Sequence, residues 1–185
     1  MQYRNLNRDD VKIYLNDIIS CYNSNRFILD SQSSLNFLNP ENLYEFILGF
    51  VEAEDSIVVG LFDDNFQFLY GLVIFDSIRF GQGIKATAEV HIAVDRTAFG
   101  KITFHLLEEL QRDCGFTTLF CHVPSIANRA IALLKKLNFK KTGYIPNCLP
   151  YKNLKGEEDL YDVQIWVYNR PNIIDELLED EEIPF

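Results

Sequence analysis

The sequence lacks the patterns that mark a membrane protein, a disulfide-rich protein or a zinc protein. Its 185 residues contain no apolar run of about eighteen residues, so they predict no transmembrane helix. The four cysteines are far apart and form no C-x-x-C pair, which indicates core thiols in a reducing compartment rather than a zinc site. The first ten residues predict neither a secretory signal nor a transit peptide, and this favours the cytoplasm.

Positive charge is also scarce. The chain has 17 Lys and Arg against 27 Asp and Glu, a net charge of −10. Binding to nucleic acid needs clustered cations, so we expect no nucleic-acid partner. The basic residues gather in one cluster, made of Lys135, Lys136, Lys140 and Lys141.

The acidic residues gather near the C-terminus, where residues 175–182 hold six carboxylates in eight positions. We therefore expect a single domain over residues 1–170 and an acidic tail over residues 171–185. Because the tail ends in Ile183, Pro184 and Phe185, it has an apolar group to bury. Two interpretations stay open: a tail that docks on the lysine cluster of its own domain or of a neighbouring subunit in a homo-oligomer or protein assembly, and a solvated tail.

Hydrophobic periodicity predicts strands and helices that alternate in the second half of the chain. The expected strands are residues 3–6, 56–62, 66–75, 87–94, 118–123, an extended segment around 140–146, and 160–168. The expected helices are residues 8–21, a helix that begins at Pro40, residues 99–114, and a short helix around 130–137. This order predicts an α/β fold: a mixed central sheet flanked by helices on both faces.

The most informative stretch is residues 118–146, a buried strand, a polar turn, a short helix and the pattern N-F-x-x-x-G from Asn138 to Gly143. It resembles the second half of the GNAT superfamily, the acetyl-CoA-dependent N-acetyltransferases, and the resemblance covers roughly residues 57–167. Asn138 stands where the family usually has Gly, and Asn tolerates left-handed backbone angles. Leu134 stands where many members have a Tyr that acts as general acid. Ala127 occupies the family's Asn position, unless a shift of one residue places Asn128 there.

The resemblance implies that the pyrophosphate of acetyl-CoA binds to backbone N–H groups between the strand 87–94 and the next helix. The family signature Q/R-x-x-G-x-G/A is incomplete here, because Gly100 is the only glycine of the loop. A phosphate loop and an ordinary turn with two cations both remain open. The residues that we expect to bind the cofactor are Val94, Arg96, Phe99, Gly100, Lys101 and Asn128.

The candidate catalytic residues lie on the strand 87–94, where alternation places Glu89 and His91 on one face. The resemblance implies a base on this strand, often Glu, so Glu89 is the first candidate and His91 the second. His105 and His122 are weaker candidates, and His122 is expected in a buried strand. Three dispersed histidines without ligand spacing predict no metal site.

Two functions stay open. The first is an acetyl-CoA-dependent N-acetyltransferase that acts on an amine, which can be a protein terminus, a lysine or a small amine. The second is a catalytically silent GNAT-like binding or structural module. A looser likeness to GNAT-like proteins of tailed phages, carried by "AEVH" at residues 88–91 and "GYIPN" at residues 143–147, adds a virion or assembly role to the second.

Overall fold

A computed structural model describes residues 2–24, 39–80, 85–95, 97–98, 104–152 and 158–169. The expected acidic tail and its docking contact lie outside these residues. The described strands form a seven-stranded sheet in the order β1-β2-β3-β4-β5-β7-β6. They are β1 (Gln2–Asn5), β2 (Ile57–Phe62), β3 (Leu69–Phe80), β4 (Lys85–Val94), β5 (Thr118–Pro124), β6 (Lys140–Lys152) and β7 (Glu158–Asn169).

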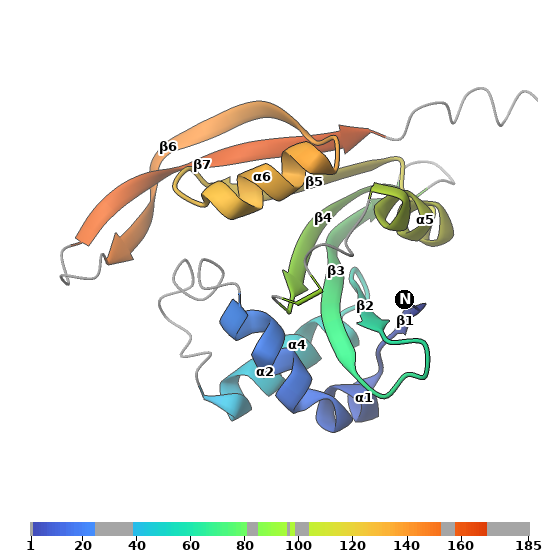
Figure 1. The fold of residues 1–185 in the computed structure, drawn as a ribbon. Helices are drawn as coiled ribbons and strands as arrows, with labels where there is room; N and C mark the ends of the chain where they lie inside the picture. Colours follow the sequence, from blue (N-terminus) through green and yellow to red (C-terminus); the bar gives the residue numbers. More distant parts are fainter. Residues whose placement is uncertain are drawn as a thin grey trace, which may run out of the picture.

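Helices cover both faces of this sheet (Figure 1). On one face lie α1 (Arg8–Ile13), α2 (Leu15–Ser24) and α4 (Pro40–Glu52), and on the other lie α5 (Phe104–Cys114) and α6 (Asn128–Lys136). Side chains alternate along each strand, so Val59 joins the core under α5 and α6 while Val58 joins the core under α1, α2 and α4. The predicted mixed sheet with helices on both faces is confirmed.

The sheet parts between β4 and β5, which are its only parallel neighbours among the described strands. The two strands pair only from Thr87 with Thr118 to Glu89 with Phe120. Beyond that point β4 continues beside β3 as far as Val94, while β5 continues beside β7 as far as Pro124. Figure 1 shows the two strands diverging. The divergence opens the sheet at its centre.

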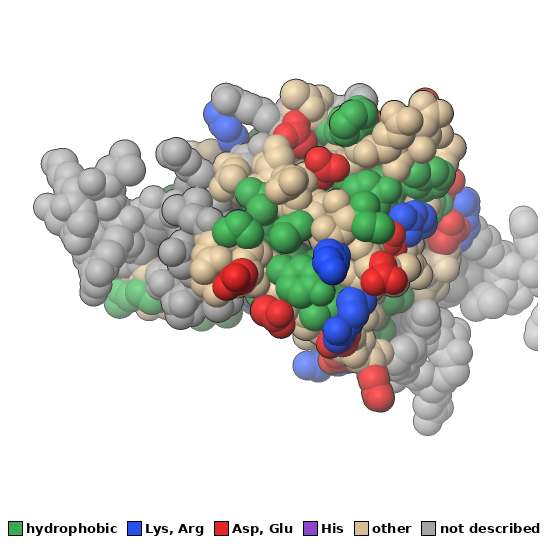
Figure 2. All heavy atoms as spheres, turned by 90° about the horizontal axis from the view of Figure 1, so that it is seen from below, with side chains coloured by type: hydrophobic (Ala, Val, Ile, Leu, Met, Phe, Trp, Pro, Cys, Tyr) green, Lys and Arg blue, Asp and Glu red, His purple; other side chains and the backbone are tan. Residues whose placement is uncertain are grey.

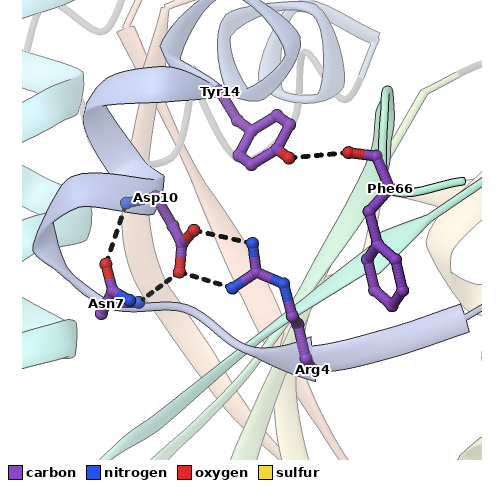
Figure 3. Close-up of polar contacts among 5 residues, drawn as sticks. All are labelled: Arg4, Asn7, Asp10, Tyr14 and Phe66. Carbon is purple, nitrogen blue, oxygen red and sulfur yellow. Dashed lines mark hydrogen bonds and ion pairs between the residues drawn. The ribbon is translucent and has the colours of Figure 1, made fainter.

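The predicted helix over residues 8–21 is wrong in one respect, because the structure interrupts it at Tyr14. Tyr14 has a φ of −98° and a ψ of 16°, outside helical values, and its hydroxyl donates to the Phe66 carbonyl oxygen at 2.8 Å (Figure 3). The start of α1 is fixed by a capping box, in which Asn7 and Asp10 each accept a backbone N–H from the other. Arg4 donates two hydrogen bonds of 2.7 Å to the carboxylate of Asp10, which ties β1 to α1.

The predicted strand over residues 66–75 is shifted in the structure, where β3 begins at Leu69 and runs to Phe80. The Asp63 carboxylate accepts the backbone N–H groups of Gln67 and Phe68, which closes a longer loop. Phe66 lies in this loop with a φ of 55°, outside the range of regular β-strands. Local side-chain hydrogen bonds therefore displaced the beginning of the strand.

Asn138 ends α6 in the way that the sequence predicted. Its φ is 61°, in the left-handed region. Its N–H donates to the Lys135 carbonyl oxygen at 3.2 Å, and the next N–H, of Phe139, donates to the Leu134 carbonyl oxygen at 2.9 Å. These two bonds form a Schellman motif, in which Phe139 also packs into the same core as Leu134. Asn138 thus performs the helix-ending role that Gly has in the family.

The outer surface mixes charges of both signs. In Figure 2, basic and acidic side chains lie close together around apolar ones on the face seen from below. One such pair joins α1 to α4, where the Arg8 guanidinium contacts the Glu52 carboxylate. Among the described residues, no helix is both long and apolar enough to cross a bilayer.

Candidate active site

A cavity of about 350 Å³ occupies the opening between β4 and β5. Three residues of α6 and its N-cap residue Ala127 line one wall, and the ends of β4 and β5 with one residue each from β6 and β7 complete it. The lining residues are Glu89, Val90, His91, Ile92, Cys121, His122, Val123, Pro124, Ala127, Ala130, Leu133, Leu134, Leu149 and Val163. Most of this lining is apolar, so the few polar groups in it define the chemistry.

The polar groups come from neighbouring strands. Glu89 of β4 lies opposite Phe120 of β5, and His122 is two residues further along β5 on the same face. The Nδ1 atom of His122 lies 2.8 Å from Oε1 of Glu89, a hydrogen bond across the mouth of the opening. The side chain of His122 is 39% exposed and that of Glu89 is 19% exposed, so the imidazole is the more accessible partner.

His91 lies beside this pair, under the Phe50 ring of α4 at a centroid distance of 6.1 Å. Its Nε2 atom is buried and has no hydrogen-bond partner, and the nearest carboxylate oxygen, Oδ2 of Asp76, is 4.0 Å away. Burial lowers the pKa of His91, against the opposing effect of the carboxylates of Glu89 and Asp76. The side chain is 39% exposed as a whole, but the buried Nε2 favours the neutral form and remains an unsatisfied polar atom next to the opening.

The structure brings together the two predicted catalytic residues, because Glu89 and His91 both line the cavity. It also adds His122, which the sequence analysis placed in a buried strand; that expectation is wrong, since the imidazole is exposed and bonded to Glu89. In the sequence, Phe120 and His122 alternate with Leu119 and Cys121, which are buried, so this alternation could have indicated that His122 lies on the other face of the strand. Glu89 and His122 become neighbours only through the register of β4 and β5, which no local pattern reveals.

Of the residues that the sequence predicts to bind the cofactor, the structure describes only Val94 and Asn128. Val94 is 2% exposed, with its side chain in the core, so only its backbone can face a ligand. Asn128 is exposed as the first residue of α6, and Ala127 lines the cavity in its place. The remaining predicted cofactor residues, Arg96, Phe99, Gly100 and Lys101, lie outside the described residues.

Two further side chains limit the chemistry of the cavity. Leu134, at the position where the resemblance implies a Tyr, lines the cavity and is 5% exposed, so α6 supplies no proton donor there. Burial raises the pKa of the Cys121 thiol to about 12. A protonated thiol is a poor nucleophile, so transfer through a covalent Cys121 intermediate is disfavoured. The arrangement instead suits proton transfer by Glu89 and His122 to or from a bound ligand.

Among the described residues, no group of three His, Cys, Asp or Glu side chains is arranged to hold a metal ion. The opening does fit the pantetheine arm of acetyl-CoA, a thin chain of methylenes and amides. Past Glu89 no described residue of β4 is paired with β5, so an extended ligand can lie beside the free edge of β4. Ala130, Leu133 and Leu134 of α6 form an apolar wall of the same cavity.

The seven-stranded sheet, parted at its centre and flanked by helices on both faces, is the fold of the GNAT acetyltransferases. No family model matches the sequence, and no curated protein matches it. Solved structures do match. The chain is similar to the ribosomal-protein-S5-alanine acetyltransferase from Vibrio fischeri, with a TM-score of 0.65 and 16% identity over 92% of this chain and 93% of that one.

It is equally similar to the spermidine N-acetyltransferase from Vibrio cholerae in complex with CoA and spermine. The TM-score is 0.65 with 18% identity, over 91% of this chain and 94% of that one. At this level of identity the likeness shows the fold, and the function has to be argued from the site.

Proposed function

We propose that this protein transfers the acetyl group of acetyl-CoA to an amine. The observation that carries the proposal is the opening between β4 and β5, with an apolar channel and a carboxylate–imidazole pair at its mouth. Acetyl-CoA supplies the activated acetyl group. The backbone of β4 and the wall of α6 are the parts of the described chain suited to its pantetheine arm, and residues 99–101 are the proposed site of its pyrophosphate.

The acceptor amine approaches from the face that carries α2 and α4, because Glu89, His91 and His122 all lie on that face. An amine is nucleophilic only without its extra proton, so a base has to remove protons from its nitrogen. Glu89 is the carboxylate at the centre of this step, and His91 and His122 are the imidazoles within its reach. The apolar cavity excludes water from the thioester.

The class of acceptor stays broad: a protein terminus, a lysine or a small amine. Two structural relatives are named for an alanine of ribosomal protein S5 and for spermidine, so both kinds of amine deserve a place in the test. The silent-module alternative differs from the enzyme in one measurable respect, because it predicts no acetylated product. The likeness to phage-encoded proteins stays a prediction.

Isothermal calorimetry with acetyl-CoA tests the first half of the proposal, and chromatography of acetylated product tests the second. We expect binding to raise the melting temperature by mass action. Product should be measured directly, since the exposed free Cys148 would react with reagents that detect CoA through its thiol. If the protein showed no binding at millimolar acetyl-CoA, the proposed acetyltransferase activity would be refuted.

A further inference from the structure

The contact between Glu89 and His122 assigns the two residues different roles. We propose that His122 is the general base of the transfer, acting through Nε2, and that Glu89 is the positioning residue that orients it. This inference rests on the proposed function and adds to it the identity and atom of the base.

Hydrogen-bond chemistry fixes the tautomer of His122. A carboxylate can only accept hydrogen bonds, whereas a neutral imidazole has one N–H donor and one bare nitrogen. Because Nδ1 of His122 lies 2.8 Å from Oε1 of Glu89, Nδ1 has to carry the proton. The bare nitrogen is then Nε2. A carboxylate that holds a histidine in this tautomer, with the other nitrogen left as base, is the arrangement of carboxylate–histidine pairs in hydrolases.

Accessibility points the same way. The His122 side chain is 39% exposed and lines the cavity, while Glu89 is 19% exposed with one oxygen already bonded to the imidazole. An incoming amine therefore meets the ring before it meets the carboxylate. The His91 side chain is also 39% exposed, but its Nε2 atom is buried and burial lowers its pKa, so His91 is the poorer base.

The surroundings of the pair suit a substrate that becomes positively charged. Asp76 of β3 is the direct cross-strand neighbour of Glu89, so two carboxylates flank the same spot on the sheet. Their negative charges attract the positive charge that forms on the amine nitrogen as it attacks. The positive charge is thus held between β3, β4 and β5 while the bond is made.

The neutral amine nitrogen attacks the thioester carbonyl carbon, and a C–N bond forms. Nε2 of His122 takes the proton that the nitrogen must lose. The C–S bond breaks, and the imidazolium returns this proton to the departing sulfur, so the products are an amide and CoA with a free thiol. One group thereby serves as base and then as acid, which removes the need for a tyrosine at the position of Leu134.

The decisive experiment compares His122→Ala, Glu89→Gln and a control, His105→Ala, which alters a histidine side chain that is 91% exposed on α5. Acetylation of spermidine and of a peptide with an N-terminal alanine is measured over a range of acetyl-CoA concentrations up to saturation. For His122→Ala we expect kcat to fall by about 100-fold or more, with KM for acetyl-CoA within about threefold of wild type. His105→Ala should match the wild type.

Chemical rescue separates a base from a structural contact. Added imidazole should restore at least about tenfold of the lost rate to His122→Ala, because it fits the space left by the ring and supplies a bare nitrogen. It should not restore Glu89→Gln, where the ring is present but unoriented. A His122→Ala variant that keeps kcat within threefold, beside an inactive Glu89→Gln, would overturn the assignment and make Glu89 the base.

NMR of the imidazole nitrogens gives a readout that needs no substrate. The chain has 3 histidines, so the ring signals can be assigned by loss in the alanine variants. We expect neutral His122 to carry its proton on Nδ1 in the wild type and to lose this preference in Glu89→Ala. A proton on Nε2 in the wild type would overturn the inference while leaving acetyl transfer intact. Binding of acetyl-CoA without transfer to either amine would instead refute the proposed function, and with it the role of His122.

Discussion

The sheet is continuous from β1 to β4 and parted between β4 and β5. The two regions differ in whether their buried polar groups are hydrogen-bonded. In the first region the Asp10 carboxylate, 8% exposed, accepts hydrogen bonds from Arg4 and from the N–H of Asn7. In the second, the buried Nε2 of His91 has no partner and the two strands stop pairing after three residues each. Complete hydrogen bonding stabilises a scaffold, whereas incomplete hydrogen bonding leaves groups available to a ligand.

The comparison predicts that the two regions can be damaged separately. The largest effect is expected at the opening, where Ala130→Trp would place an indole in the cavity of about 350 Å³. We expect the affinity for acetyl-CoA, measured by calorimetry, to fall by about 100-fold or more, equivalent to about 2.7 kcal/mol. Ala132→Trp is the matched control, because Ala132 is exposed on the same helix and does not line the cavity. Wild-type affinity in Ala130→Trp would show that the ligand does not use this opening.

In the N-terminal region we expect the opposite result, a loss of stability with no change in ligand binding. Asp10→Ala removes the acceptor of the two Arg4 hydrogen bonds and half of the capping box, so the free energy of unfolding should fall by about 2 kcal/mol. Chemical denaturation measures this, and acetyl-CoA binding should not change. Asp9→Ala, an exposed carboxylate in the same helical turn, should change stability by less than about 0.5 kcal/mol.

The contact between Arg4 and Asp10 also predicts how stability depends on pH in the acid range. Hydrogen bonds from Arg4 hold the pKa of Asp10 below its ordinary value. A depressed carboxyl pKa contributes stability that is fully present above the unfolded pKa of about 3.9 and is lost as pH falls through the lower folded value. The difference in stability between wild type and Asp10→Ala should therefore shrink below about pH 4. A difference that stayed constant into acid would contradict the ion pair.

His91 should have a milder effect on stability, with its own pH dependence. Its pKa is lowered mainly by burial, so below about pH 6.5 the unfolded chain binds a proton that the folded site resists. Stability is then complete above that pH and should decline below it by at most about 1.4 kcal/mol per pH unit. The groups that face the ring are Glu89, Asp76, His122 and Phe50. His91→Phe should flatten the decline between pH 7 and 5, and His105→Ala should leave it unchanged; an equal decline in both variants would contradict this account.

Much of the scaffold could be predicted from the sequence because its signals are local. Hydrophobic alternation and helical spacing identified the strands, the helices and their order, and the resemblance over residues 118–146 indicated the sheet. The two errors in the N-terminal half differ in kind. The helix is interrupted at Tyr14, whose hydroxyl bonds to Phe66, 52 residues away, whereas β3 starts late because Asp63 closes a local loop before it.

The site was only partly predictable, for the same reason. Glu89 and His91 share a strand, so alternation alone placed them together. His122 is 33 residues from Glu89 and reaches it through the parallel register of two strands that pair over a short stretch. A register between distant strands is fixed by packing, which single-sequence patterns do not contain. The sequence therefore indicated Glu89 and His122 as separate candidates but not their contact.

The smallest expected effect tests a local signal at the end of α6. Asn138 holds a left-handed φ of 61°, which costs free energy for any residue with a Cβ and none for Gly. Asn138→Gly should therefore keep or raise the free energy of unfolding by up to about 1 kcal/mol, although Gly adds flexibility to the unfolded chain. Lys136→Gly, two residues earlier and within the helix, should lower it by about 1 kcal/mol. Thermal and chemical denaturation should show changes of opposite sign in the free energy of unfolding for these two replacements by glycine. If both destabilised the protein equally, the left-handed cap would not be what ends α6, and the resemblance to the family's glycine at this position would lose its physical basis.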